Sequence, residues 1–241
     1  MQDRIHKISA VRKSAQWGFS LLELMVVVAI LTVVLAVVMK GASQLQQKSS
    51  SEALKVDLTQ ESRQFIDQIV KDLHHSGYPN IRMYEAAAAA ADPTLYGDGL
   101  VSIDQWTLQF EGDVDGTGTV SEVFVQLNPP GGPCPCTLQR GTVSKATWIA
   151  TGLGPPYYTQ VDNVMNANAN VNVFTALKND GQAVQLPCTK AGGCADGTPM
   201  ENITAVGITL NVRTPTRDQT DRSFATVTMS SEAKINNLVT N

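Results

Sequence analysis

The pattern of hydrophobic and polar positions changes twice along the 241 residues of the chain. From residue 19 to residue 39 every position is apolar except Ser20, Glu23 and Thr32. At 1.5 Å per residue, such a helix is about 30 Å long and matches the hydrocarbon thickness of a membrane. We therefore predict a membrane-spanning helix here. Its Glu23 needs a cationic partner, because an unpaired carboxylate in hydrocarbon is costly.

A second helical pattern follows, and in it only one face is apolar. Apolar residues recur at spacings of four or seven: Leu54, Leu58, Phe65, Ile69 and Leu73. Charged residues occupy the positions between them, as on a helix that packs against a domain. Gly77 then supplies a left-handed helix cap, and Pro79 prevents the helix from continuing. The pattern predicts one long helix from about residue 19 to about residue 76.

Beyond a linker at residues 81–100, the hydrophobic period changes to two. The linker contains six alanines at 86–91, which favour a short helix. The expected strands span 105–110, 120–127, 146–151, 171–177, 183–186, 203–213 and 224–229. A long helix against an antiparallel sheet is the simplest packing of these elements, so we expect the α+β fold class.

Charge and length narrow the choice of function. The net charge of the chain is −4, which argues against nucleic-acid binding through a generally basic surface. The apolar segment is preceded by a basic stretch, residues 1–18, and this arrangement places the N-terminus in the cytoplasm and the rest outside. An ordinary secretory signal is cut after its apolar region, whereas the plausible cut here lies before it, between Gly18 and Phe19. Cleavage at that point keeps the apolar helix in the mature protein.

A basic leader ending in Gly and followed by Phe-Ser-Leu-Leu-Glu-Leu-Met-Val-Val-Val-Ala-Ile closely resembles the cleavage and methylation motif of type IV prepilins and type II secretion pseudopilins. The resemblance implies that prepilin peptidase cuts after Gly18 and methylates the new amine of Phe19. It also implies that Glu23 pairs with the Phe19 ammonium of a neighbouring subunit. The alternative is a plain single-pass anchor with an accidental Glu.

The same resemblance implies the pilin fold and a division of the chain. The expected parts are a leader (1–18), a transmembrane and filament-core helix (19–40), an amphipathic half-helix (41–79) and an extracytoplasmic β-rich domain (80–241). Residues 62–79, which end on Gly-Tyr-Pro, are similar to the end of the long helix in PilW-type minor pilins. J-type pseudopilins share such a helix but less often that ending, and His74 and His75 depart from the PilW pattern.

Four acidic residues have the spacing of a calcium-binding loop. Glu111, Asp113, Asp115 and Glu122 occupy loop positions one, three, five and twelve, with Gly116 at six, as in an EF-hand. The flanking segments are predicted strands, so a Gly- and Asp-rich hairpin explains the same residues without metal. Calcium and a bare hairpin are both open at this point, and PilW-like proteins often carry such a turn.

The four cysteines form two close clusters: Cys134 with Cys136, and Cys188 with Cys194. They follow the predicted membrane helix, on the side where disulfides persist. The Cys134-Pro-Cys136 spacing is too tight to bridge comfortably, so we favour two bonds that link the clusters. A ring closed by Cys188 and Cys194 and a four-thiolate zinc site are the alternatives, and the zinc spacing is poor.

The sequence offers little for catalysis. Histidine occurs only at positions 6, 74 and 75, and no nucleophile elbow, phosphate-binding loop or zinc-protease helix is present. We interpret four aromatic residues as core or rim residues in preference to a sugar-binding platform: Trp106, Trp148, Tyr157 and Tyr158. The leading hypothesis is therefore a non-enzymatic minor pilin that assembles with other pilins on an inner-membrane platform and reaches the cell surface. A J-type pseudopilin and a membrane-anchored calcium-dependent adhesin are the alternatives.

Overall fold

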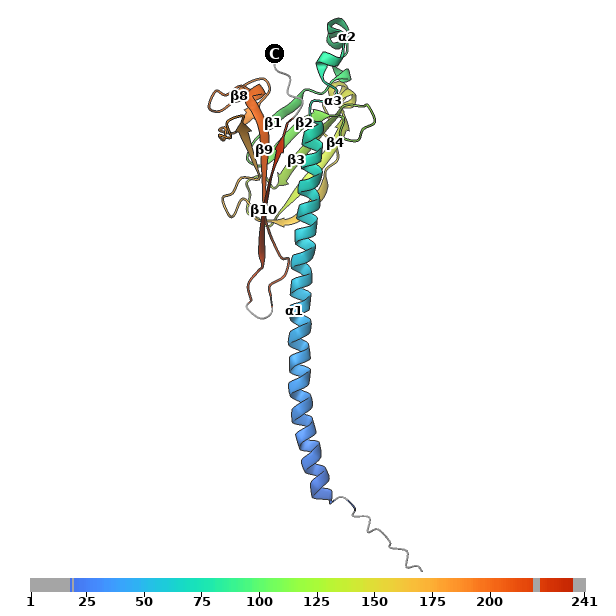
Figure 1. Ribbon diagram of the computed structural model, residues 1–241, viewed down its shortest axis with the longest axis vertical. Coiled ribbons are helices and arrows are strands. Elements are labelled where there is room, and N and C mark those ends of the chain that lie inside the picture. Colours follow the sequence, from blue (N-terminus) through green and yellow to red (C-terminus); the bar gives the residue numbers. More distant parts are fainter. Residues whose placement is uncertain (1–17, 19, 219–221, 236–241) are drawn as a thin grey trace, which may run out of the picture. The chain divides into compact units, whose positions relative to one another are not determined.

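The computed structural model describes residues 18, 20–218 and 222–235. The chain forms two compact units, and the boundary between them lies between Lys48 and Ser49. A helix, α1 (Leu21–His75), begins in the first unit and ends in the second (Figure 1). In the second unit its buried apolar residues are Leu58, Phe65, Ile66, Ile69 and Leu73. The long helix and its one-sided apolar stripe are therefore confirmed.

The second unit contains a ten-stranded sheet in which every pairing is antiparallel. Its strands are β1 (Gly99–Ile103), β2 (Thr107–Gly112), β3 (Ser121–Asn128), β4 (Cys136–Ser144), β5 (Tyr158–Val164), β6 (Phe174–Lys178), β7 (Cys188–Thr189), β8 (Gly193–Cys194), β9 (Ile203–Arg213) and β10 (Thr226–Lys234). The order is β10-β9-β5-β4-β3-β2-β1-β7-β8, and β6 pairs with β9. This arrangement confirms the α+β class, with a long helix and an antiparallel sheet.

The short elements differ from the sequence prediction. Residues 86–91 form the expected helix α2 (Ala86–Ala91), but the strand predicted at 146–151 is a helix, α3 (Lys145–Thr151). The Ser144 hydroxyl accepts a hydrogen bond from the Thr147 amide, and Gly152 closes the helix with a positive φ of 62°. These two caps outweigh the apolar spacing. The strand predicted at 183–186 is also wrong, since it reduces to one bridge between Leu177 and Ala183.

The end of α1 is joined directly to the sheet. Ser76 forms a β-bridge with Gly112, and the Gly77 amide donates to the Glu111 carbonyl at 2.8 Å. A Cβ at position 112 would overlap the carbonyl oxygen of His75, so only glycine permits this approach. The contact fixes where the helix stops relative to β2.

A buried ion pair joins the same helix to β4. Asp72 is fully buried, and its Oδ2 accepts hydrogen bonds from Arg140 at 2.8 and 3.1 Å, while Gln68 donates to Oδ1 at 2.8 Å. Burial raises the pKa of Asp72, although Arg140 acts in the opposite direction. The carboxylate therefore depends on Arg140 to remain charged inside the protein.

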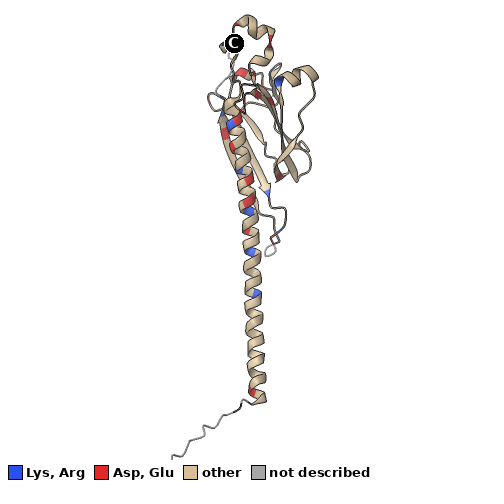
Figure 2. Ribbon diagram, turned by 90° about the vertical axis from the view of Figure 1, so that its right-hand side faces the viewer, with Lys and Arg blue, Asp and Glu red and all other residues tan. Residues whose placement is uncertain are grey.

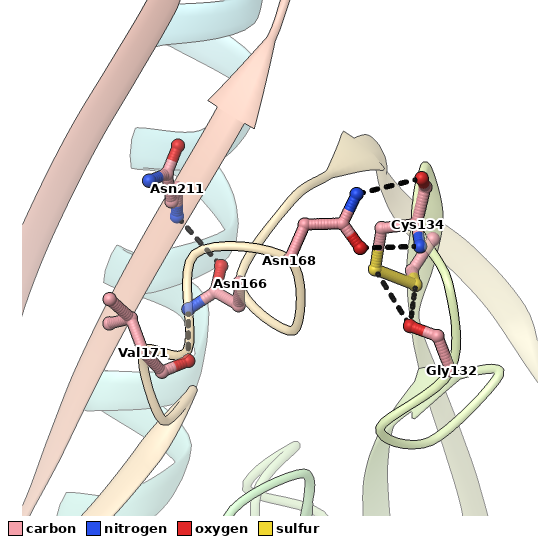
Figure 3. Close-up of a disulfide and its surroundings, with 7 residues drawn as sticks. Gly132, Cys134, Asn166, Asn168, Val171 and Asn211 are labelled. Carbon is pink, nitrogen blue, oxygen red and sulfur yellow. Dashed lines mark hydrogen bonds between the residues drawn. A yellow bond between two sulfur atoms is a disulfide. The ribbon is translucent and has the colours of Figure 1, made fainter.

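Both disulfides close within a cysteine cluster, so the predicted links between clusters are wrong. Figure 3 shows the disulfide at Cys134. The Cα atoms of Cys134 and Cys136 are 4.5 Å apart, and the β7–β8 hairpin places Cys188 opposite Cys194. Three strands separate β4 from β7, which is about 19 Å at the usual strand spacing and far beyond disulfide reach. All four sulfurs are oxidised, which leaves no thiolate for zinc.

The tight Cys134–Cys136 loop is held in place by the side chain of Asn168. Its Oδ1 accepts from the Cys134 amide at 2.9 Å, and its Nδ2 donates to the Cys134 carbonyl at 3.1 Å (Figure 3). The sequence did not predict that Asn168 holds Cys134, because the two residues lie 34 positions apart in the chain.

Replacing Arg140 by Met should leave the buried Asp72 carboxylate unpaired. We expect the free energy of unfolding to fall by about 3–5 kcal/mol near neutral pH, the usual cost of breaking a buried pair. The loss should shrink in acid, where Asp72 is protonated. Thermal unfolding of the full chain followed by circular dichroism measures both effects.

Arg63→Met is the matched control, because it removes an exposed arginine of the same helix that forms no ion pair with any described residue. A surface substitution of this kind changes stability by about 0.5 kcal/mol at most. An equal loss of stability in the two variants would contradict a special role for the Asp72–Arg140 pair.

Candidate functional site

The first part of α1, residues 21–39, is an apolar helix that the described residues leave uncovered. Every large apolar side chain from Leu21 to Met39 is at least 50% exposed, and the helix is long and apolar enough to cross a membrane. Between Glu23 and Lys40 it carries no charged residue (Figure 2). A continuous apolar surface of this size marks contact with lipid or with partner proteins.

Thr32 has a hydrogen-bond partner within the apolar helix, whereas Glu23 has no ion-pair partner among the described residues. Thr32 donates its hydroxyl to the Ala29 carbonyl at 2.8 Å, which satisfies it within the helix. Glu23 lies in the first turn, where the helix dipole favours a negative charge, and it forms no ion pair with any described residue. In a nonpolar environment the Glu23 carboxylate therefore needs a cation that the described residues do not supply.

The predicted processing junction lies just before this turn. Gly18 is exposed, whereas Phe19 lies outside the described residues. The helix begins with the Leu24 amide donating to the Ser20 carbonyl at 3.1 Å. The candidate site thus consists of an accessible glycine, the residue after it, and a carboxylate one helical turn further along.

Residues 14–39 match the family model of the prokaryotic N-terminal methylation motif. The match spans the end of the basic leader, the Gly18–Phe19 junction, Glu23 and the apolar run. It supports a type IV pilin or pseudopilin precursor that prepilin peptidase processes, and it indicates a structural subunit anchored by its apolar helix. No curated protein and no solved structure matches the chain.

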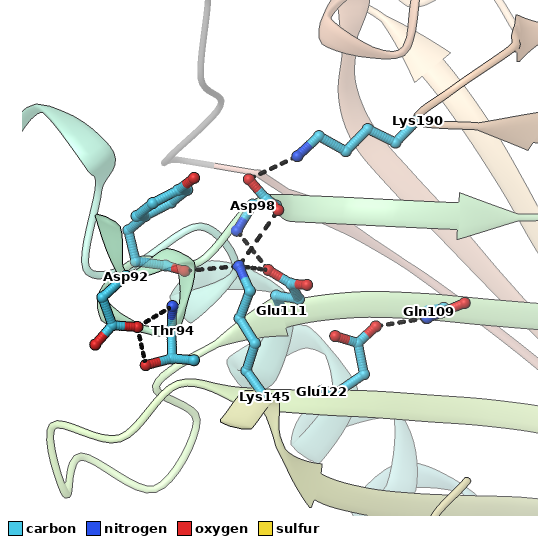
Figure 4. Close-up of polar contacts among 9 residues, drawn as sticks. Asp92, Thr94, Asp98, Gln109, Glu111, Glu122, Lys145 and Lys190 are labelled. Carbon is cyan, nitrogen blue, oxygen red and sulfur yellow. Dashed lines mark hydrogen bonds and ion pairs between the residues drawn. The ribbon is translucent and has the colours of Figure 1, made fainter. Parts of the chain in front are cut away.

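A polar cluster lies where β2 ends and β3 begins, and it contains two of the four acids of the predicted calcium loop, Glu111 and Glu122 (Figure 4). Glu111 and Glu122 are direct cross-strand partners. Lys145, which is almost fully buried, approaches Glu111 Oε2 at 2.6 Å and Asp98 Oδ2 at 3.3 Å. Lys190 holds the other oxygen of Asp98 at 2.6 Å. Two lysines therefore balance two carboxylates.

Glu122 is the remaining acid of this cluster and forms no ion pair with any described residue. It is fully buried, and its Oε1 accepts from Gln109 at 2.5 Å, while Oε2 has no hydrogen-bond partner within the described part of the chain. Burial, followed by the neighbouring Glu111, raises its pKa to about 8. Glu122 is thus held in the neutral form that a buried carboxyl prefers.

Asp113 and Asp115 lie in the turn between these strands and bind backbone amides. Asp113 accepts from the Thr117 and Gly118 amides at 3.0 and 2.9 Å, and Asp115 accepts from the Thr117 amide and hydroxyl. Within the described ranges, no three His, Cys, Asp or Glu side chains gather as a metal-ion ligand set. Calcium binding by this loop stays a prediction, and the hairpin accounts for the acids that are seen.

The sequence motif identified Glu111 and Glu122 but missed Lys145, which lies between Glu111 and Asp98. Lys145 opens α3, which was predicted as a strand, and Asp98 was assigned to a linker. The alternation of residues along the two predicted strands was a signal for the glutamates only, because it places Glu111 and Glu122 on one face of the sheet.

Replacing Glu122 by Gln should change the pH dependence of stability. The folded-state pKa of Glu122 lies above the ordinary value of 4.5, so its contribution is complete below that pH and is lost as the pH rises through about 8. The side chain at position 122 of the variant is neutral at every pH. We therefore expect equal melting temperatures at about pH 4, and a melting temperature several degrees higher than that of wild type at about pH 9.

Melting temperatures of the full chain, followed by tryptophan fluorescence across this pH range, test the expectation. Glu201→Gln removes an exposed acid of the same domain and serves as the control. Parallel pH profiles for wild type and Glu122→Gln would contradict the neutral state of Glu122.

Proposed function

We propose that this protein is a minor pilin of a type IV pilus, of the PilW type, which inserts in the inner membrane and takes part in initiating filament assembly. The supporting observation is the uncovered apolar helix with Glu23 in its first turn, directly after the processing junction. Such a helix requires a nonpolar environment both before and after assembly, which lipid and a bundle of like helices supply in turn.

In this proposal each segment has one task. Residues 1–18 are removed as the leader, 19–40 form the membrane and filament-core helix, 41–79 join that helix to the domain, and 80–241 lie outside the inner membrane. Other pilins, prepilin peptidase and the assembly platform are the partners. The methylation motif is common to type II secretion pseudopilins, so the genes beside this one decide between a pilus and a J-type pseudopilin.

Glu23 is proposed to pair with the methylated amine of Phe19 in a neighbouring subunit. Cleavage at Gly18 creates a positive charge at the start of an apolar helix, which is as costly in hydrocarbon as the carboxylate. Two parallel helices offset along their axes by about one turn bring both charges together. The pairing removes two penalties at once and fixes the axial stagger between subunits.

The mass of the mature N-terminus tests the processing step. We expect a chain that begins at N-methylated Phe19 when prepilin peptidase is present, and a chain that still carries the residues before Phe19 when the peptidase is deleted. Intact-protein mass spectrometry with fragmentation of the N-terminal peptide measures both. A mature chain that begins elsewhere would remove the basis of the proposal.

Replacing Glu23 by Val should leave membrane insertion intact and reduce incorporation into filaments at least about tenfold, equivalent to about 1.4 kcal/mol of lost pairing. Immunoblots of sheared filaments and of membrane fractions separate the two effects. Thr32→Val is the control on the same helix, because the Thr32 hydroxyl is already satisfied by Ala29. Normal incorporation of the Glu23 variant would exclude the pairing role.

A further inference from the structure

A cavity in the second unit lies apart from both clusters described above. Its volume is 250 Å³, and it is lined by Asp104, Gln105 and Trp106 from the β1–β2 turn and by Leu186 and Pro187 before β7. Pockets that bind small molecules are commonly apolar with a few fixed polar groups, and this lining has that composition.

Both walls of the cavity are held in position by the backbone. In the turn, Asp104 Oδ1 accepts from the Trp106 and Thr107 amides at 2.6 and 2.8 Å, and the Gln105 carbonyl accepts from the Val173 amide at 2.9 Å. The opposite wall precedes Cys188, which is fixed by its disulfide and by pairing with Ile103. The pocket is therefore formed before any ligand arrives.

The lining retains unused hydrogen-bonding groups of both kinds. The Oδ2 atom of Asp104, the Gln105 amide and the Trp106 indole N–H have no hydrogen-bond partner among the described residues. Gln105 is exposed, and Asp104 and Trp106 are half-buried. A ligand that uses all three must both donate and accept hydrogen bonds.

We propose that this cavity binds a neutral saccharide. The hydroxyl groups of a sugar donate to Asp104 and accept from Gln105 and, at the edge of its ring, from the Trp106 indole N–H, while its C–H groups pack on Leu186 and Pro187. An anionic ligand would meet the Asp104 charge, which is the only charge in the lining. A cation would pair with Asp104, but choline, which has a single hydroxyl group, could accept from only one of the two N–H donors. The site goes beyond filament assembly and would give the subunit a surface ligand.

Saturation-transfer NMR on the full chain tests the proposal. The chain is held in polyoxyethylene detergent micelles, because this detergent contains neither a sugar nor an amine. The probes are glucose, galactose, mannose and N-acetylglucosamine, each added separately, and choline is the cationic comparison. We expect transfer to the ring protons of at least one sugar and none to choline.

Two conservative variants then locate the binding site. Gln105→Ala removes an exposed amide, and Trp106→Phe keeps a ring but loses the N–H, so each should weaken sugar binding about three- to tenfold. Tyr158→Ala, which removes an exposed aromatic outside the cavity, should leave binding unchanged. Transfer to none of the four sugars, transfer to choline alone, or sugar transfer that survives both variants would each overturn the proposal.

Discussion

The structure depends on one constraint, which is that the apolar surface of residues 21–39 cannot face water. Nothing among the described residues covers it. A helix of this composition is stable only in lipid or among similar helices, so this part of the chain is complete only within a membrane or an assembly. The single carboxylate in its first turn adds a second requirement, for a cation in the same nonpolar environment.

The second half of α1 is also helical, but it packs as part of the domain core. From Leu58 onward one face is buried against the sheet, and the polar residues Asp72 and Ser76 attach the helix to β4 and β2. The helix thus passes from a segment that needs external cover to one that is itself part of a core. A change of pattern within one continuous element is enough to connect the two environments.

Polar groups inside the domain are concentrated where segments distant in sequence meet. Lys145 links the loop before β1 to β2, and burial raises the pKa of the Glu122 carboxyl beside it. At the other end of β1, the turn containing Asp104 and the chain before Cys188 enclose the cavity. These contacts position loops on a rigid sheet, which is the usual location of binding surfaces.

The sequence by itself determined the membrane-type helix, its amphipathic continuation, the α+β class and the processing motif. These features are local, because a run of apolar residues, a helical period and a junction sequence each depend only on neighbours along the chain. The short Gly18–Glu23 stretch could therefore be recognised without any structure.

Only the tertiary structure decided the remainder. The disulfide pairing follows from the positions of β4 and β7 in the sheet, and α3 replaced a predicted strand because its caps at Ser144 and Gly152 outweighed the apolar pattern. The spacing of the four acids did not reveal that Lys145 would occupy the space beside Glu111. Such contacts join residues far apart in the chain, and their energies depend on burial and register, which no local pattern records.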